Sequence, residues 1–172
     1  MGRAVTCAGL PRPHLAEPLG LQNVRWWGND PAWLYPLEAG ARRRYGEALR
    51  RTERPGRLSY RLDLSVTARS GLVPVRVEFH RVPPYERWGL DPRDYPRVFA
   101  DPGAASPHRM PDDSLCLYFP DDPRAQRWTA DKGLDELFAL TARHLFAEDY
   151  WRSSNETWPF DEAPHGLPQA VR

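Results

Sequence analysis

The clearest pattern in the chain is a strict alternation of hydrophobic and polar residues along two neighbouring stretches, residues 58–66 and residues 73–79. Side chains of a strand point alternately to its two faces, so each stretch predicts a strand with one buried face. Ser70-Gly71 between them favours a turn, and the pair therefore predicts an antiparallel hairpin. Pro74 lies on the polar face of the second stretch, which indicates a sheet edge or the start of a strand.

Two shorter apolar stretches complete the predicted sheet. Residues 94–101 (DYPRVFAD) form a third strand candidate, and residues 114–119 (SLCLYF) form a fourth. Prolines cluster before and between these stretches, which indicates long connecting loops. We therefore expect a four-stranded antiparallel meander that begins at residue 58.

A helix is predicted before the sheet. Asp30 suits the N-cap and Pro31 the first helical position, whereas Pro36 is expected to interrupt the helix. From Leu37 the apolar residues recur at helical spacing, and the helix is expected to end near residues 51–56 (RTERPG). Its outward face would carry Arg42, Arg43, Arg44, Arg50 and Arg51.

A second, amphipathic helix is predicted over residues 133–146 (GLDELFALTARHLF), followed by an irregular tail. Trp151, Trp158 and Phe160 in that tail are expected to dock on the body of the protein. Helices packed against an antiparallel sheet make the fold class α+β. At 172 residues, the length predicts a single domain, residues 1–172.

Composition favours a globular cytoplasmic protein. The chain is 41% hydrophobic and 27% charged with a net charge of +1, so charge gives no general attraction to nucleic acid or membrane. No apolar run is long enough for a bilayer span, and residues 1–20 lack the apolar core of a secretory signal. Two cysteines far apart in sequence favour a reducing compartment. Lys132 is the only lysine, and all other basic residues are arginine.

Cys116 is the residue with most chemical interest. It lies between two leucines, eight residues after His108, and acidic residues flank it at positions 112, 113, 121 and 122. The pattern fits a buried structural cysteine as well as a nucleophile at the end of a strand. If Cys116 is a nucleophile, it should be solvent-accessible, at the edge of a shallow groove.

Short motifs around Cys116 together resemble the ubiquitin-conjugating enzymes. Residues 95–99 (YPRVF) are similar to that family's Pro-Pro-x-Val-x-Phe strand, and Pro107-His108 occupies the place of its His-Pro-Asn motif. Residues 113–117 (DSLCL) resemble its active-site segment. Trp128-Thr129 resembles the Trp-Ser/Thr pair that opens its next helix.

The likeness covers about residues 30–166, which leaves residues 1–29 as an N-terminal extension. Residues 157–166 (TWPFDEAPHG) are similar to bacterial members found in ubiquitin-like conjugation and anti-phage operons, including CBASS operons with a cGAS-like nucleotidyltransferase. The resemblance implies a ubiquitin-conjugating-enzyme-like fold: a helix, a four-stranded meander, an active-site loop and a second helix.

The resemblance also implies roles for the site residues. Cys116 would carry the C-terminus of a ubiquitin-like protein, or of a partner such as the nucleotidyltransferase, as a thioester received from an activating enzyme. His108 would organise the loop. The family's asparagine is absent, since Arg109 and Met110 follow His108, and Ser114 or a backbone N–H would serve as oxyanion donor instead. No cofactor or metal is implied, and the family's acidic gate residue has Glu148 and Asp149 as candidates.

Two alternatives stay open. The fold could serve as a binding module with Cys116 in its core, or Cys116 could act in a hydrolase with His108, His144 or His165. Acidic neighbours raise a thiol pKa, which favours a thioester carrier over a hydrolase.

Other candidate sites have less support. Cys7 and His14 lack a second ligand pair at zinc spacing. The arginine-rich first helix is expected to present a solvated face rather than a nucleic-acid site, because the chain is balanced in charge and no aromatic residue is interleaved to stack on bases. If this face has a function, the resemblance implies that it contacts the activating enzyme.

Overall fold

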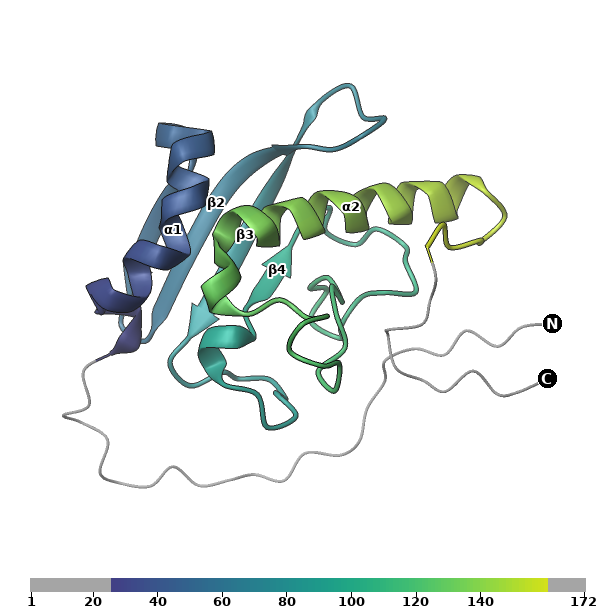
Figure 1. The fold of residues 1–172 in the computed structure, drawn as a ribbon. Coiled ribbons are helices and arrows are strands. Elements are labelled where there is room, and N and C mark those ends of the chain that lie inside the picture. The colour runs from purple at the N-terminus through teal and green to yellow at the C-terminus, as the bar shows by residue number, and fades with distance from the viewer. Residues whose placement is uncertain (1–25, 161–172) are drawn as a thin grey trace.

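The computed structural model describes residues 26–160 as helices on one side of an antiparallel sheet (Figure 1). Its main elements are α1 (Pro31–Tyr45), β1 (Arg50–Arg54), β2 (Arg57–Ser65), β3 (Leu72–His80), β4 (Arg97–Phe99) and α2 (Gly133–Ser153). The strands lie in the order β1-β2-β3-β4, and each pair of neighbours is antiparallel. The α+β class and a four-stranded antiparallel sheet are therefore confirmed, but only β2, β3 and β4 correspond to strands that the sequence predicts.

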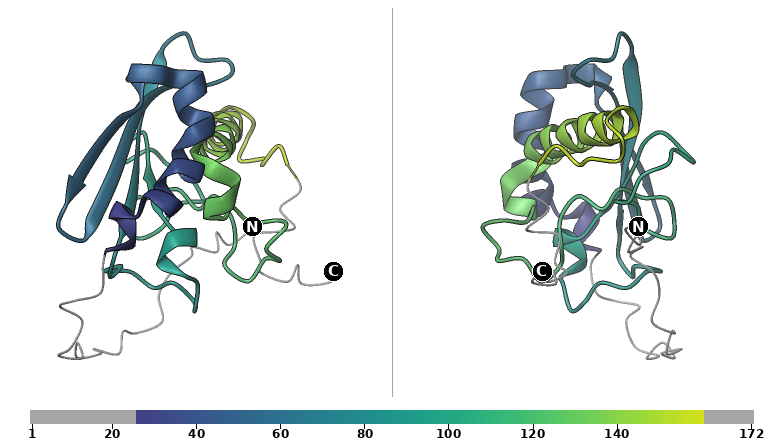
Figure 2. Two further views of the ribbon diagram at one scale, coloured as in Figure 1. Left: turned by 60° about the vertical axis from the view of Figure 1, so that its left-hand side comes forward. Right: turned by 90° about the vertical axis from the view of Figure 1, so that its right-hand side faces the viewer.

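The hydrophobic alternation places the core between the sheet and the helices. The residues of β2 that alternate with polar positions, Leu58 to Leu64, are buried, and so are their counterparts in β3. Figure 2 shows that α1 and α2 cover this face and leave the opposite face of the sheet open. Within residues 26–160, no helix is both long and apolar enough to cross a membrane.

The first strand corrects the sequence analysis. The expected helix stops at Tyr45, a 3-10 turn (Gly46–Ala48) follows, and Arg50 and Arg51 lie in β1 rather than on a helix. Gly46 ends the helix with φ of 53° while its N–H donates to the carbonyl of Arg42. A positive φ is readily adopted by glycine only, so the helical geometry cannot continue through it. Pro36, expected to interrupt the helix, lies inside α1.

The last predicted strand is a second correction. Residues 114–119 do not form a strand, and the segment takes part in a single isolated bridge between Arg109 and Leu115. The sheet instead ends at β4, which pairs with β3 over three residues. β4 pairs with residues 76–78 of β3, so Pro74 lies in a part of β3 that is paired with β2 only. This agrees with the sequence prediction that Pro74 lies at an edge or near the start of a strand.

The second helix and the tail agree better with the sequence. α2 includes residues 133–146 as expected but continues to Ser153, so Trp151 lies in the helix and not in an irregular tail. Trp158 packs on the rings of His108 and His144, and Arg143 lies over the ring of Phe160. Docking of Trp158 and Phe160 on the body of the protein is thus confirmed.

Candidate functional site around Cys116

Backbone hydrogen bonds on both sides fix the position of Cys116. Its N–H donates to the carbonyl of His108 at 2.9 Å, and the N–H of Leu115 donates to Val98 in β4 at 2.8 Å. The N–H of Met110 donates to the carbonyl of Ser114 and closes the tight turn between them. Residues 108–116 are thus a short irregular hairpin attached to the edge of the sheet, which we call the cysteine hairpin.

Cys116 is less accessible than we expected. Only 8% of the residue is exposed, and Met110, Leu115 and Leu117 beside it are equally buried. The expectation of a solvent-accessible cysteine at a groove edge is therefore wrong for this conformation, because the apolar residues that flank Cys116 bring it into the core. Cys116 nevertheless keeps a small exposed fraction, unlike the core residues with no exposed surface.

His108 anchors the cysteine hairpin through its backbone and its ring. The N–H of His108 donates to Ser106 Oγ at 3.1 Å, while its carbonyl holds Cys116. The centroid of its ring lies 4.2 Å from that of Trp158 and 6.2 Å from that of His144. These contacts are what a loop organiser needs, and the assignment of that role stays a prediction.

Ser114 is completely buried, and its hydroxyl is already engaged. Ser114 Oγ donates to Asp112 Oδ1 at 2.5 Å, and the backbone N–H of Ser114 donates to the same oxygen at 3.1 Å. Arg97 lies 3.2 Å from the other oxygen of Asp112. In this arrangement the Ser114 hydroxyl cannot donate to an oxyanion.

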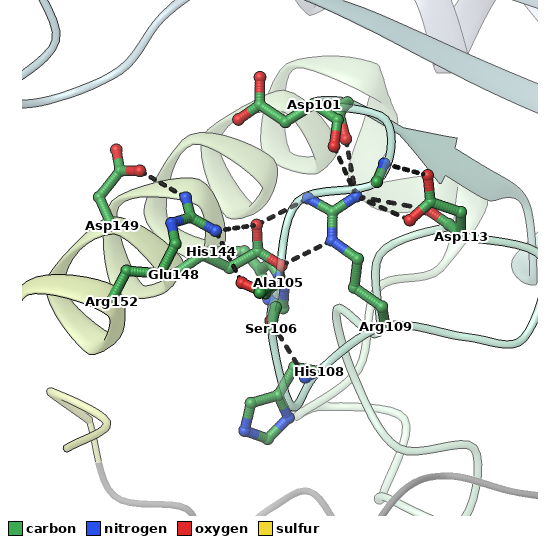
Figure 3. A network of polar contacts seen from close by, with 12 residues as sticks. Asp101, Ala105, Ser106, His108, Arg109, Asp113, His144, Glu148, Asp149 and Arg152 are labelled. Carbon is green, nitrogen blue, oxygen red and sulfur yellow. Dashed lines mark hydrogen bonds and ion pairs between the residues drawn. The ribbon is translucent and has the colours of Figure 1, made fainter. Parts of the chain in front are cut away.

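Arg109 connects the cysteine hairpin to the rest of the fold (Figure 3). Its guanidinium binds both oxygens of Glu148 in α2, at 3.0 and 2.8 Å. It also donates to the carbonyls of Ala100 and Asp101, just after β4, and lies 3.2 Å from Asp113 Oδ1. A rigid planar fork of donors is suited to such a multiple contact, and lysine could not reproduce it.

Glu148 is fully buried at the centre of this network. Burial by itself raises the pKa of Glu148, but contacts with His144 and Arg109 outweigh it and lower the pKa to about 2. His144 Nε2 lies 3.4 Å from Glu148 Oε1. Glu148 is therefore an ionised structural partner of Arg109, and its burial is unsuitable for a gate that meets an incoming amine.

Asp149, the other candidate for the acidic gate, belongs to a second ion-pair group. It accepts two hydrogen bonds from Arg69, at 2.6 and 2.8 Å, and one from Arg152 at 2.6 Å. Arg69 also lies 2.6 Å from Asp101, next to the carbonyls that Arg109 binds. Figure 3 shows Asp149 and Arg152 beside Glu148 on α2. Both acidic candidates thus stabilise the packing of α2.

Trp128-Thr129 lies just before α2, as the resemblance implied. Trp128 is almost completely buried, and its indole N–H donates to the carbonyl of Gly133 at 2.9 Å. Thr129 precedes the 3-10 turn Ala130–Lys132 that leads into α2. The pair therefore fixes the start of the helix on the core.

Sequence reasoning missed the Arg109–Glu148 pair, since 39 positions separate its members and no local pattern connects them. Cys7, His14 and His165 lie outside the described residues. Among residues 26–160, no group of three or more His, Cys, Asp or Glu side chains is arranged to hold a metal ion. No family model, curated protein or solved structure matches the chain.

Proposed function

We propose that the protein is a ubiquitin-conjugating-like carrier that holds the C-terminus of a ubiquitin-like protein, or of a defence partner such as a cGAS-like nucleotidyltransferase, as a thioester on Cys116. The observation that carries the proposal is the fixed position of Cys116. It lies between the four-stranded meander and α2, held by the backbone of His108 in a hairpin tied to β4. Backbone hydrogen bonds that hold a residue in one position in this way suit a nucleophile that must be placed accurately.

The chemistry needs a sulfur that can both attack and leave. The Cys116 thiolate attacks the carbonyl carbon of the activated C-terminus, and the thiolate of the activating enzyme departs as the new C–S bond forms. An amine then attacks the same carbon, the C–N bond forms, and Cys116 leaves as thiolate while the amine loses a proton.

The burial of Cys116 adds a requirement to this proposal. A carbonyl carbon must come within bonding distance of the sulfur, and 8% exposure does not leave room for it. Docking of the cargo must therefore enlarge the opening over Cys116. Adduct formation and thiol accessibility have to be measured separately for this reason.

The proposal is tested by incubating the protein with an activating enzyme, a ubiquitin-like protein and ATP, then comparing gels with and without a thiol reductant. Wild type and Cys7→Ser should both form an adduct that the reductant cleaves. Cys116→Ser should form a reductant-resistant oxyester, and Cys116→Ala should form nothing. The proposal fails if partners that demonstrably charge the activating enzyme leave wild type unmodified. Release of free cargo without an adduct would instead favour the hydrolase.

A second candidate is a non-catalytic binding module, which is favoured by the burial of Cys116 and the engaged hydroxyl of Ser114. Maleimide labelling of Cys7→Ser, which retains only Cys116, distinguishes the two candidates. A carrier whose opening is enlarged by cargo docking should be labelled faster in native buffer when the cargo is present than when it is absent. A core cysteine should react only as fast as the protein unfolds, so labelling in native buffer would track the unfolding rate.

A further inference from the structure

The face of the sheet that the helices leave open carries a straight row of arginines. Arg50 in β1 is paired with Arg61 in β2, Arg61 with Arg76 in β3, and Arg76 with Phe99 in β4. Directly paired residues of neighbouring strands point to the same face, so all four side chains form one line across the sheet. Arg50 and Arg61 are exposed, and the guanidinium of Arg76 lies 4.1 Å from the centre of the Phe99 ring.

The row lines a shallow hollow of about 530 Å³. Two carboxylates also contribute to its wall, Asp63 and Asp101, and Asp101 is already paired with Arg69. Arg76 is paired with Glu78. Among the ion pairs within residues 26–160, none involves Arg50 or Arg61. Two adjacent cations of the row are therefore available to an anionic ligand.

The row begins at an edge of the sheet. β1 is paired with β2 only, and all five of its residues are exposed. An edge strand presents unpaired backbone N–H and C=O groups that can accept a further strand. Arg50 and Arg54 lie on the same face of β1, because residues separated by an even number of positions share a face. Pairing with β1 of a second copy would bring arginines together, and like charges directly opposite one another are unfavourable.

We propose that β1 and the arginine row bind an acidic peptide in extended conformation, which adds to the sheet as a fifth strand. Its backbone would pair with β1, and carboxylates four positions apart would lie across from Arg50 and Arg54. A nucleic acid could not use the backbone groups of the edge, and Phe99, the aromatic residue of the row, is covered by Arg76. This surface does not involve Cys116, so the inference goes beyond the proposed carrier function and stands independently of it.

The test uses a fluorescent synthetic peptide in which glutamate alternates with valine, and its binding is followed by anisotropy. The control peptide has glutamine in place of glutamate. We expect the acidic peptide to bind, the control to bind at least about tenfold more weakly, and added salt to weaken binding. Arg50→Glu/Arg54→Glu should reduce affinity about tenfold or more. Arg43→Glu, an exposed arginine on α1, is the matched control and should change affinity less than twofold.

Strand addition itself is tested with two further peptides, each N-methylated at one of the two alternating sets of amides. One edge of the peptide faces β1, so one methylated peptide should lose binding and the other should retain it. Equal binding of both would overturn strand addition. Tighter binding of a single-stranded oligonucleotide of equal charge, or of phosphatidylserine vesicles, would overturn the peptide as occupant. Cys116→Ala should bind the peptide like wild type, whatever the outcome for the thioester.

Discussion

Arg109 is the residue on which the order of the cysteine hairpin most directly depends. It is buried with Glu148, and it also satisfies two backbone carbonyls that follow β4. A buried charge without its partner is strongly unfavourable, because desolvation is then not compensated. The same residue stands directly after His108, in the segment that lacks the asparagine of the resembled family. In this chain that position serves structure, through a contact to a helix 39 residues away.

Removing Arg109 should therefore destabilise the protein. Arg109→Met leaves the buried Glu148 carboxylate with only its longer contacts to His144 and Arg152, and we expect a loss of about 3–5 kcal/mol in the free energy of unfolding. Arg109→Lys preserves the charge but not the bidentate geometry, so it should restore only part of that loss. Urea denaturation of the two variants and of wild type measures these differences in the free energy of unfolding. Equal stability of wild type and Arg109→Met would show that the pair contributes nothing.

Glu148 also makes stability depend on pH. Its pKa is about 2 in the folded protein, against 4.5 for an unperturbed glutamate. A lowered pKa contributes stability that is fully present above about pH 4.5 and disappears as the pH falls toward 2. This difference in pKa corresponds to about 3 kcal/mol in the free energy of unfolding. The groups that face Glu148 are Arg109, His144 and Arg152.

The measurement compares urea denaturation of wild type and Glu148→Gln between pH 7 and pH 3. The advantage of wild type should be constant near neutral pH and should shrink steadily below pH 4.5. A constant gap down to pH 3 would mean that the lowered pKa of Glu148 does not stabilise the fold. Asp149→Asn serves as a control for the neighbouring ion pairs, which are more exposed.

At the scale of elements, sequence patterns predicted the helices and strands whose formation depends on neighbouring residues in the chain. The β2–β3 hairpin follows from uninterrupted alternation, and α2 follows from its amphipathic spacing. β1 was assigned to a helix because its charged residues show no alternation. The Pro55-Gly56 pair directly before β2 was the available signal, since such a pair favours a tight turn between two strands.

The cysteine hairpin could not be derived in the same way. A short apolar run such as residues 114–119 fits a strand and a buried irregular segment equally well. The path of the cysteine hairpin is determined by one hydrogen bond to Val98 and one to His108. The Arg109–Glu148 ion pair then attaches the hairpin to α2. These are tertiary contacts between distant residues, so no spacing rule predicts them. The position of Cys116 between β4 and α2 was nevertheless anticipated by the order of the motifs.

The boundary between α1 and β1 gives an element-scale prediction. Gly46 has φ of 53° and ψ of −128°, and an added Cβ would meet no atom within 4 Å. Gly46→Ala should therefore cost about 1–3 kcal/mol through backbone strain alone. Gly71→Ala is the matched control, because Gly71 is equally open and has no positive φ. Thermal unfolding of both variants should show a clearly larger loss of stability for Gly46→Ala than for Gly71→Ala. Equal losses would contradict the prediction that the positive φ of Gly46 strains any other residue.

At the scale of the whole molecule, the distribution of amines restricts self-modification. Lys132 is the only lysine of the chain. Its Nζ donates to the carbonyls of Ala125 and Arg127, at 3.1 and 2.9 Å, and lies 3.8 Å from Glu136. An ammonium held in this way must lose these contacts and a proton before it can attack a thioester.

If the carrier proposal holds, automodification should therefore be slight. Mass spectrometry after a charging reaction should find only trace modification, at Lys132 or at the N-terminal amine. Lys132→Arg should abolish the modification at residue 132 without changing the yield of the thioester on Cys116. Abundant modification of Lys132 would show that the contacts of its side chain do not protect it.

The ion pair between Arg109 and Glu148 also limits how far the protein can be truncated from its C-terminal end. A chain that ends before residue 148 would keep the sheet and most of α2, but it would leave a buried guanidinium without its carboxylate. The cysteine hairpin and the second half of α2 should therefore open together, as one cooperative unit. In amide hydrogen exchange, Cys116 and Leu145 should show similar protection although 29 residues separate them. Proteolytic removal of the end of α2 would then release the cysteine hairpin, so the position of Cys116 depends on the last turns of this helix.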